Sequence, residues 1–297
     1  MRLVVTSCYG GGFVETLFVG ADPENGAASG RCGFFATTAD LPATGCDPNP
    51  DRPDQEGYAL HFLNALRGRD RNGRALPIAE LDLDGDGRIS LSEAHARARI
   101  ALGSVDVPTS TSERWLRGAL RGAAPPRNAR SDGPAALPEE EAVVRALTKK
   151  TGLPAELELV RRVLREREEK IDEAWGVYDD AAKAEDEAAR RAIAGLLSRW
   201  PVLDDPFHPA FAETVRCQRA AIAAHLKRSA AYEDYREAAR ASDEAEADHW
   251  ELRRRAAPIE RLLRALENLA LAARLRAKGG PAWTRYQAIL ACERTRP

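Results

Sequence analysis

Residues 82–93 read Asp-Leu-Asp-Gly-Asp-Gly-Arg-Ile-Ser-Leu-Ser-Glu, and the spacing of the acidic side chains predicts their local structure. Carboxylates stand at the first, third and fifth positions (Asp82, Asp84 and Asp86), glycine at the sixth (Gly87) and glutamate at the twelfth. In a tight turn, alternate side chains converge on one point, and glycine permits a bend that a Cβ would obstruct. Carboxylates held around one point repel one another unless a cation lies among them. The segment therefore predicts a metal-binding turn.

This spacing is that of the EF-hand loop, in which oxygen atoms surround one calcium ion at roughly 2.3–2.6 Å. Position seven contributes its backbone carbonyl, position nine acts directly or through a water, and position twelve closes the site with two oxygens. The predicted Ca²⁺ ligands are therefore Asp82, Asp84, Asp86, Arg88, Ser90 and Glu93. The alternative is an acidic turn that caps a helix without holding an ion.

The flanks of the loop differ in length. Residues 90–102 predict an amphipathic exiting helix, whereas Pro77 leaves room for only about one helical turn before Asp82. We find no second loop to pair with this one, and calcium sensing normally uses a helix pair that opens. The expected role of the ion is therefore structural.

The composition excludes several classes of partner. Lys and Arg total 44 against 46 Asp and Glu, and the formal charge of -2 predicts no nucleic-acid partner. No stretch approaches the roughly 18 apolar residues of a membrane span, and the start lacks the apolar region of a secretory signal. As written, the chain is expected to be cytoplasmic, with its localisation otherwise unknown. Five scattered cysteines predict no dense disulfide framework and favour a reducing compartment.

The amino-terminal part contains two short β-type runs, residues 2–7 and 33–38, each followed by turn residues. Such runs are typical of buried parallel strands in an α/β fold. Cys8 ends the first run and precedes three glycines, a position that suits a nucleophile beside free backbone N–H groups. The alternative is an inert core cysteine.

The cysteine segment, with Phe-Ala-Thr-Thr-Ala-Asp at 35–40 and Gly-Cys-Asp at 45–47, resembles the legumain-type (C13) caspase-fold cysteine peptidases. The resemblance covers roughly residues 2–67 and implies a helix over 57–66. It implies that Cys8 is the nucleophile and that its own N–H, with Gly10 nearby, stabilises the oxyanion. The implied fold is a partial caspase-like α/β domain with an incomplete sheet, and the implied substrate is a peptide.

The chain departs from this family in one respect. Family members place the catalytic His before the cysteine strand, whereas all five histidines here follow it. A thiol without a base is mostly protonated at neutral pH. We therefore expect an amino-terminal truncation, a separate chain that supplies the other half, or a decayed peptidase core. Whether this chain is an enzyme stays uncertain at this point.

The predicted domains are a partial caspase-like domain over 1–121 that contains the calcium loop, a linker over 122–137, and a helical part over 138–297. Apolar residues at helical spacing predict an all-α bundle or coiled-coil hairpin there, with breaks at 201–209 and 278–281. We expect this part to self-associate or to bind a partner protein. Its core is expected to contain Trp175, Trp200, Trp250 and Trp283.

Three functions remain open. The first is a calcium-binding protein that carries half, or the remnant, of a cysteine endopeptidase domain. The second is a non-catalytic, calcium-stabilised helical scaffold or interaction protein. The third is a structural protein whose acidic loop holds no ion.

Overall fold

The computed structural model describes residues 1–27, 30–44, 56–121 and 137–296. The chain forms two compact units, of which unit 1 contains residues 1–166 and 254–297, and unit 2 contains residues 167–253. Unit 1 thus joins the amino-terminal part to the last helices. The expected division into 1–121 and 138–297 had placed these helices in a separate domain. Residues 122–136 of the expected linker lie outside the described residues.

Unit 1 contains a small sheet in the order β1-β2-β3. The edge strand β1 (Arg2–Val5) pairs in parallel with β2 (Cys32–Phe35), and β2 pairs antiparallel with β3 (Thr109–Ser110). The two expected β-type runs therefore form parallel strands. Strands β2 and β3 are buried throughout, whereas β1 leaves alternate side chains exposed at the edge of the sheet.

Three 3-10 helices connect β1 to β2: η1 (Gly10–Leu17), η2 (Val19–Ala21) and η3 (Pro23–Asn25). The glycines after Cys8 thus begin a helix instead of an open turn. The N–H of Gly10 donates to the carbonyl of Ser7 and the N–H of Gly12 to that of Tyr9. These bonds occupy backbone donors that an oxyanion site would need free.

The expected partial caspase-like α/β domain is wrong. In the described residues the sheet has three strands of four, four and two residues, and helices form most of the fold. The physical reason lies in β2, whose two faces are covered by helices from distant parts of the chain. A resemblance in one strand and its turn does not determine what packs on either side of that strand.

Phe34 and Phe35 of β2 pack into two different cores. Phe34 packs with α1 (Tyr58–Leu66) and α2 (Leu91–Ala101), at the positions expected for helices in 57–66 and 90–102. Phe35 packs with η1, α3 (Thr111–Ala119), the end of α7 (Ala230–Lys278) and α8 (Gly280–Glu293). The carboxyl-terminal helix is therefore part of the amino-terminal core.

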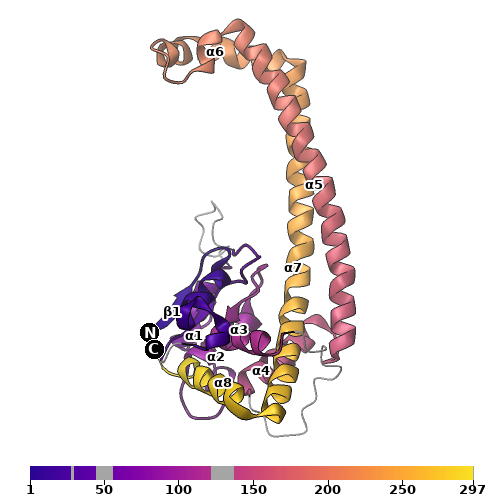
Figure 1. Ribbon diagram of the computed structural model, residues 1–297. Coiled ribbons are helices and arrows are strands. Elements are labelled where there is room, and N and C mark those ends of the chain that lie inside the picture. Colours follow the sequence, from indigo (N-terminus) through magenta and orange to yellow (C-terminus); the bar gives the residue numbers. More distant parts are fainter. Residues whose placement is uncertain (28–29, 45–55, 122–136, 297) are drawn as a thin grey trace. The chain divides into compact units, whose positions relative to one another are not determined.

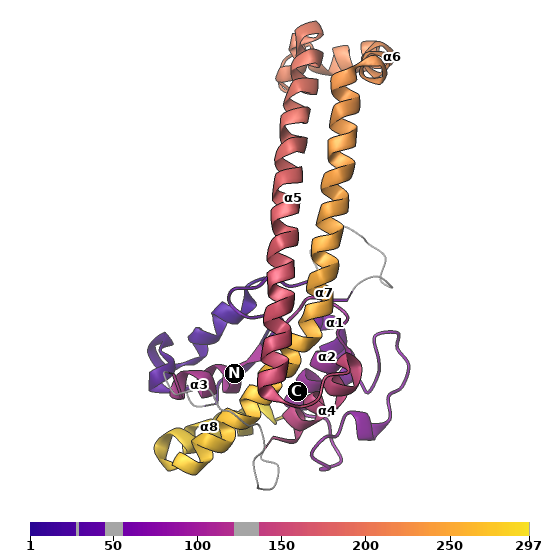
Figure 2. The ribbon, with the colours of Figure 1, turned by 90° about the vertical axis from the view of Figure 1, so that its right-hand side faces the viewer.

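The helical prediction for the carboxyl-terminal part is confirmed. The chain forms α4 (Pro138–Thr151), α5 (Leu157–Arg199), η6 (Pro201–Asp204), α6 (Phe211–Arg228), α7 and α8. Both expected breaks coincide with helix ends, after α5 and between α7 and α8. Within unit 2, the segments of α5 and α7 run antiparallel, side by side (Figure 2).

The tryptophans differ from the expectation that all four lie in a core. Trp200 is buried and donates from Nε1 to Gln218 Oε1 at 2.6 Å, whereas Trp175 is 52% exposed. Trp175 instead makes edge contacts with Tyr178 and with the buried His249. Trp250 and Trp283 are partly buried.

A disulfide joins Cys32 in β2 to Cys292 in α8, 260 residues away in the sequence. One disulfide is not a dense framework, but it does not fit the reducing compartment that the sequence favoured, since disulfides persist mainly in oxidising surroundings. Cys8 and Cys217 are free thiols, and Cys46 lies outside the described residues. In the described part of the chain, no helix is both long and apolar enough to cross a membrane.

Candidate metal site

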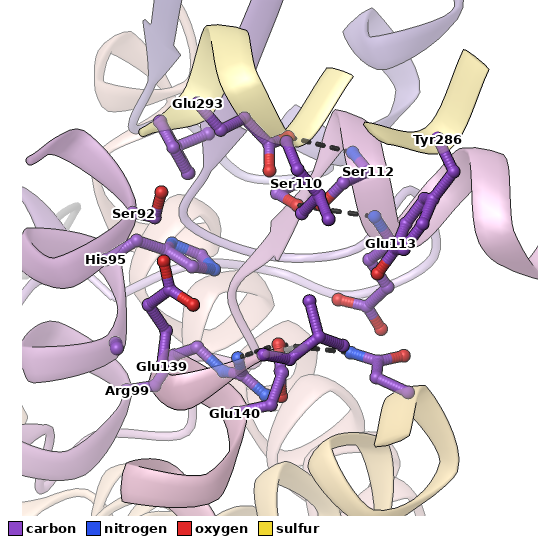
Figure 3. A pocket seen from close by; sticks show the side chains of 15 residues that line it. Ser92, His95, Arg99, Ser110, Ser112, Glu113, Glu139, Glu140, Tyr286 and Glu293 are labelled. Carbon is purple, nitrogen blue, oxygen red and sulfur yellow. Dashed lines mark hydrogen bonds and ion pairs between the residues drawn. The ribbon is translucent and has the colours of Figure 1, made fainter. Parts of the chain in front are cut away.

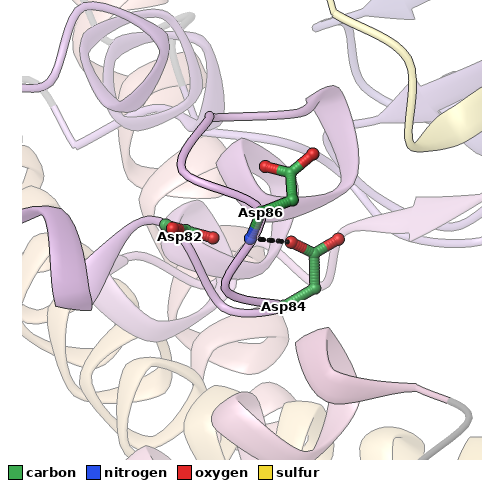
Figure 4. A group of neighbouring side chains, drawn as sticks. All are labelled: Asp82, Asp84 and Asp86. Carbon is green, nitrogen blue, oxygen red and sulfur yellow. Dashed lines mark hydrogen bonds between the residues drawn. The ribbon is translucent and has the colours of Figure 1, made fainter.

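Three aspartates of the predicted calcium loop converge in the structure (Figure 4). One carboxylate oxygen from each of Asp82, Asp84 and Asp86 lies within 4.8 Å of the others. Asp82 is half-buried and the other two are exposed, so the cluster opens to solvent. The loop lies between η5 (Ile78–Glu80), the single turn expected after Pro77, and α2.

Backbone N–H groups of the loop hold these carboxylates in place. Asp82 accepts from the N–H of Gly85 at Oδ1 (2.8 Å) and from that of Gly87 at Oδ2 (2.9 Å). Asp84 Oδ1 accepts from the N–H of Asp86 at 3.1 Å. Gly85 and Gly87 have φ of 80° and 79°, values that side-chain-bearing residues rarely adopt. The glycines thus give the turn its shape, and the turn orients the acids.

Glu93 has a different place from the three aspartates. It is buried, and the group of converging carboxylates does not include it. Its Oε2 accepts from the N–H of Ser90 (2.7 Å), and its Oε1 accepts from the N–H groups of Leu83 (2.6 Å) and Asp84 (3.3 Å). Glu93 therefore closes the loop through backbone hydrogen bonds. To coordinate an ion directly, Glu93 would have to give up some of these hydrogen bonds.

Ser90 is the N-cap of α2, and its hydroxyl accepts from the N–H of Glu93 at 3.2 Å. Together with the reverse bond from Glu93, this forms a capping box at the end of the loop. Arg88 is exposed, consistent with a role for its backbone alone. The structure thus brings Asp82, Asp84 and Asp86 together, and coordination by Arg88, Ser90 and Glu93 stays a prediction.

The carboxyl-terminal residues also contact the loop, which the sequence did not indicate. The N–H of Leu91 donates to the carbonyl of Thr295 at 3.1 Å. Arg294 donates twice to Glu139, at 2.8 and 2.9 Å. Burial opposes the charge of Arg294, but Glu139 and, more weakly, Asp84 outweigh it and raise the pKa of Arg294. No local pattern could predict these contacts, since they join residues 155 to 210 positions apart in the sequence.

The surroundings of Cys8 do not form a catalytic pair. Cys8 is half-buried, and its Sγ donates to the carbonyl of Ala43 at 3.4 Å. In the part of the chain that the structure describes, Cys8 forms no hydrogen bond with a histidine. His61 binds Glu56 (3.0 Å) and His95 binds Tyr58 (2.8 Å). The predicted oxyanion donor Gly10 is occupied by Ser7.

A small polar cavity lies between α2, α3, α4 and α8 (Figure 3). Its volume of about 30 Å³ suits one or two water molecules and excludes an organic substrate. Ionisable and hydroxyl side chains from α2, β3, α3, α4 and α8 line it: Ser92, His95, Arg99, Ser110, Ser112, Glu113, Glu139, Glu140, Tyr286 and Glu293. No pattern in the sequence indicates this cluster, because its members come from five separate elements.

The pKa values of two buried glutamates at this cavity are shifted in opposite directions. Burial raises the pKa of Glu293 to about 7, although its Oε1 accepts from the N–H of Ser112 at 2.8 Å. Burial would also raise the pKa of Glu113, but Arg264, Arg117 and Arg99 outweigh burial and lower that pKa to about 2. Arg117 and Arg264 contact Glu113 directly, at 3.0 and 2.6 Å. These contacts join α3 to α7 and α8.

Comparison with known proteins identified no relative: no family model, no curated protein and no solved structure matches this chain.

Proposed function

We propose that this chain is a calcium-binding protein in which residues 82–93 hold one Ca²⁺ that stabilises unit 1. One observation carries the proposal: carboxylate oxygens of Asp82, Asp84 and Asp86 converge within 4.8 Å on a turn held open by two glycines. Placing three negative charges so close costs free energy without a cation, even at an exposed site. The convergence is what a bound cation would require.

The donor set favours calcium over other metals. All predicted ligands are oxygen atoms, and the described residues place no cysteine or histidine in the cluster. Oxygen-only sites suit hard cations, and Ca²⁺ accepts irregular, flexible geometry more readily than Mg²⁺. The backbone bonds of Glu93 would compete with its coordination of the ion, so we expect lower affinity than in a loop whose glutamate is free.

Packing of the exiting helix supports a stabilising role. Leu91, Ala94 and Ala98 of α2 are buried against α1 and Phe34. The entering side is the three-residue helix η5. Sensing requires a pair of helices that opens and exposes a groove, and this loop lacks a long entering helix for such a pair. Unit 1 would therefore gain stability from the ion, in a calcium-stabilised helical scaffold.

The peptidase activity implied by the family resemblance is not part of this proposal. The caspase-like domain is absent from the described residues, and the thiol of Cys8 bonds to a carbonyl oxygen.

Calorimetric titration of chelator-treated protein with Ca²⁺ tests the proposal. We expect one binding event and a rise in melting temperature, since an ion at 100 times its dissociation constant adds about 2.7 kcal/mol to stability. Asp84→Asn should weaken binding at least about tenfold, because it removes a ligand charge while its Oδ1 can still accept from Asp86. The control Asp40→Asn removes an exposed charge outside the loop.

Absence of both heat and a melting shift at millimolar Ca²⁺ would refute the proposal. Equal loss of affinity in the Asp84 and Asp40 variants would also refute it, because the effect would then come from net charge and not from the loop.

A further inference from the structure

We infer that the carboxyl-terminal segment Cys292–Thr295 positions the calcium loop, and that the Cys32–Cys292 disulfide thereby raises the affinity of the loop for Ca²⁺. The inference rests on the proposed calcium binding and adds a redox control to it. It starts from a main-chain contact between the two ends of unit 1.

That contact lies inside the predicted loop. Leu91 is the tenth loop residue, between Ser90 and Glu93, and its N–H donates to the carbonyl of Thr295 at 3.1 Å. Leu91 is also the first residue of α2, where N–H groups have no partner within the helix. Thr295 supplies the missing acceptor, and it fixes the backbone next to two predicted ligands.

The segment that carries Thr295 is tied to unit 1 by the disulfide. Thr295 bonds back to the carbonyl of Cys292 through its N–H (3.3 Å) and its hydroxyl (2.6 Å). Cys292 is bonded to Cys32, which is buried in the central strand β2. Thr295 is therefore only three residues from Cys292, and the disulfide joins Cys292 covalently to the sheet. Reduction would leave only non-covalent contacts.

Charge contributes less than position to this coupling. Arg294 acts on Asp84 electrostatically, and a lone cation there would repel Ca²⁺. Glu139, however, holds Arg294 through two hydrogen bonds and balances its charge. The segment Cys292–Thr295 therefore changes the net charge near the loop little, while its hydrogen bond orders the backbone of Leu91. Ordering before binding lowers the entropy that the ion must offset, so the oxidised chain should bind more tightly.

Reduction converts the disulfide to two thiols with two electrons and two protons from a small dithiol, which becomes a cyclic disulfide. Because linkage is reciprocal, bound Ca²⁺ must disfavour reduction by the same factor by which the disulfide favours Ca²⁺. Other contacts still hold the segment, among them the bond from Arg2 Nε to Thr295 Oγ1 at 2.6 Å. We therefore expect about a threefold to tenfold change in Ca²⁺ affinity.

The first test compares Ca²⁺ titrations of the oxidised chain, the dithiol-reduced chain and the variant Cys32→Ala/Cys292→Ala. All three are made with Cys8, Cys46 and Cys217 replaced by alanine, so that one disulfide alone can form. The titrations are run below the melting temperature of each protein, because the dissociation constant of folded protein does not report global stability. The oxidised chain should bind about threefold to tenfold more tightly than either other form.

The second test removes the hydrogen bond alone. Leu91→Pro deletes the N–H at the first helical position, where proline is tolerated, and Ser90 already has the extended conformation that proline requires of its predecessor. Leu91→Ala is the matched control, because it loses the same buried side chain and keeps the N–H. Leu91→Pro should bind Ca²⁺ about threefold or more weakly than Leu91→Ala.

The outcomes separate the two proposals. If the oxidised chain binds no Ca²⁺, both the proposed function and this inference fail. If all forms bind Ca²⁺ equally and the two Leu91 variants agree, calcium binding stands and this inference is overturned. Tighter binding by the reduced chain would also overturn it.

Discussion

At the scale of single residues, buried charges in unit 1 depend on a few specific acceptors. Arg99 and Arg261 are among the largest fully buried side chains. Arg99 donates to Glu140 Oε1 at 2.6 Å, whereas Arg261 donates to three carbonyl oxygens in the segment after α2. A buried guanidinium is tolerated only with such acceptors, since loss of one partner leaves an uncompensated charge.

Glu140→Gln should therefore destabilise the protein by roughly 3 kcal/mol, because it leaves Arg99 charged and buried without its counter-charge. Glu141→Gln is the matched control on the same helix. Glu141 faces the exposed Arg145 at 3.9 Å, and such pairs contribute at most about 0.5 kcal/mol. Urea unfolding of the two variants measures the difference, and equal losses would contradict the role given to Arg99.

Glu293 gives stability a dependence on pH. Its pKa is raised from 4.5 to about 7 by burial, so the folded state binds the proton more tightly than the unfolded state does. The contribution of protonated Glu293 to the free energy of unfolding is complete below pH 4.5 and is lost as pH rises to about 7. The loss amounts to about 3 kcal/mol. Glu293→Gln should abolish this loss, and it should gain stability relative to the parent chain across that range.

His61 acts in the opposite direction, because burial lowers its pKa from 6.5 to about 4 and its contribution is lost as pH falls through that range. Urea unfolding at several pH values, in the presence of a chelator, measures the free energy of unfolding of the Glu293 variant and of the parent chain. Both proteins contain His61, so its effect cancels when one free energy is subtracted from the other. Glu166→Gln controls for loss of an exposed charge. A difference that does not vary with pH would contradict the prediction.

At the scale of elements, local chemistry at helix ends explains where the helices begin and end. Ser90 and Ser110 cap α2 and α3 by accepting the N–H of the glutamate three residues later. Gly152 ends α4 with a φ of 71°, in the left-handed conformation that favours glycine. These signals act within one turn of helix, independently of the rest of the fold.

Two glycine substitutions should therefore change stability in opposite directions. Gly152→Ala should cost about 1 kcal/mol, because alanine is strained at a φ of 71°. Gly176→Ala, within α5, should add about 0.5–1 kcal/mol through higher helix propensity. A Cβ at either position meets no atom within 4 Å, so crowding does not confuse the comparison. Thermal unfolding followed by circular dichroism measures both, and shifts of the same sign would count against this account.

At the scale of the whole molecule, the disulfide closes almost the entire chain into a loop. It joins β2 to α8 across 260 residues and thereby holds the last helix in the amino-terminal core. A covalent link between such distant positions restricts the unfolded chain strongly. The stability of unit 1 should therefore depend on this one bond.

Replacement of both Cys32 and Cys292 by alanine should lower the free energy of unfolding by about 2–5 kcal/mol. Cys217→Ala removes an exposed thiol and should change it by less than about 0.5 kcal/mol. Guanidinium unfolding of both variants at equal calcium concentration gives the comparison. Equal midpoints would show that the disulfide does not stabilise the fold.

Sequence alone located the acidic turn, the helix that leaves it, the two parallel strands and the breaks between the long helices. Each depends on residues within a few positions of one another, such as Gly87 in the turn or the proline and glycine residues after α5 and α7. Backbone conformation and nearby hydrogen bonds determine these features, so they can be read from local patterns. The caspase-like prediction went wrong where it extended one strand and turn to a whole domain.

Only the tertiary structure decided which distant residues meet. The Cys32–Cys292 bond, the contact of Leu91 with Thr295 and the burial of Glu293 join segments separated by 181 to 260 residues or converging from several elements. Such contacts depend on which apolar faces bury one another once loops close, and no spacing in the sequence encodes that choice. The acidic side chains of the loop are close in sequence and could be found from their spacing, whereas the contacts that support the loop come from distant residues.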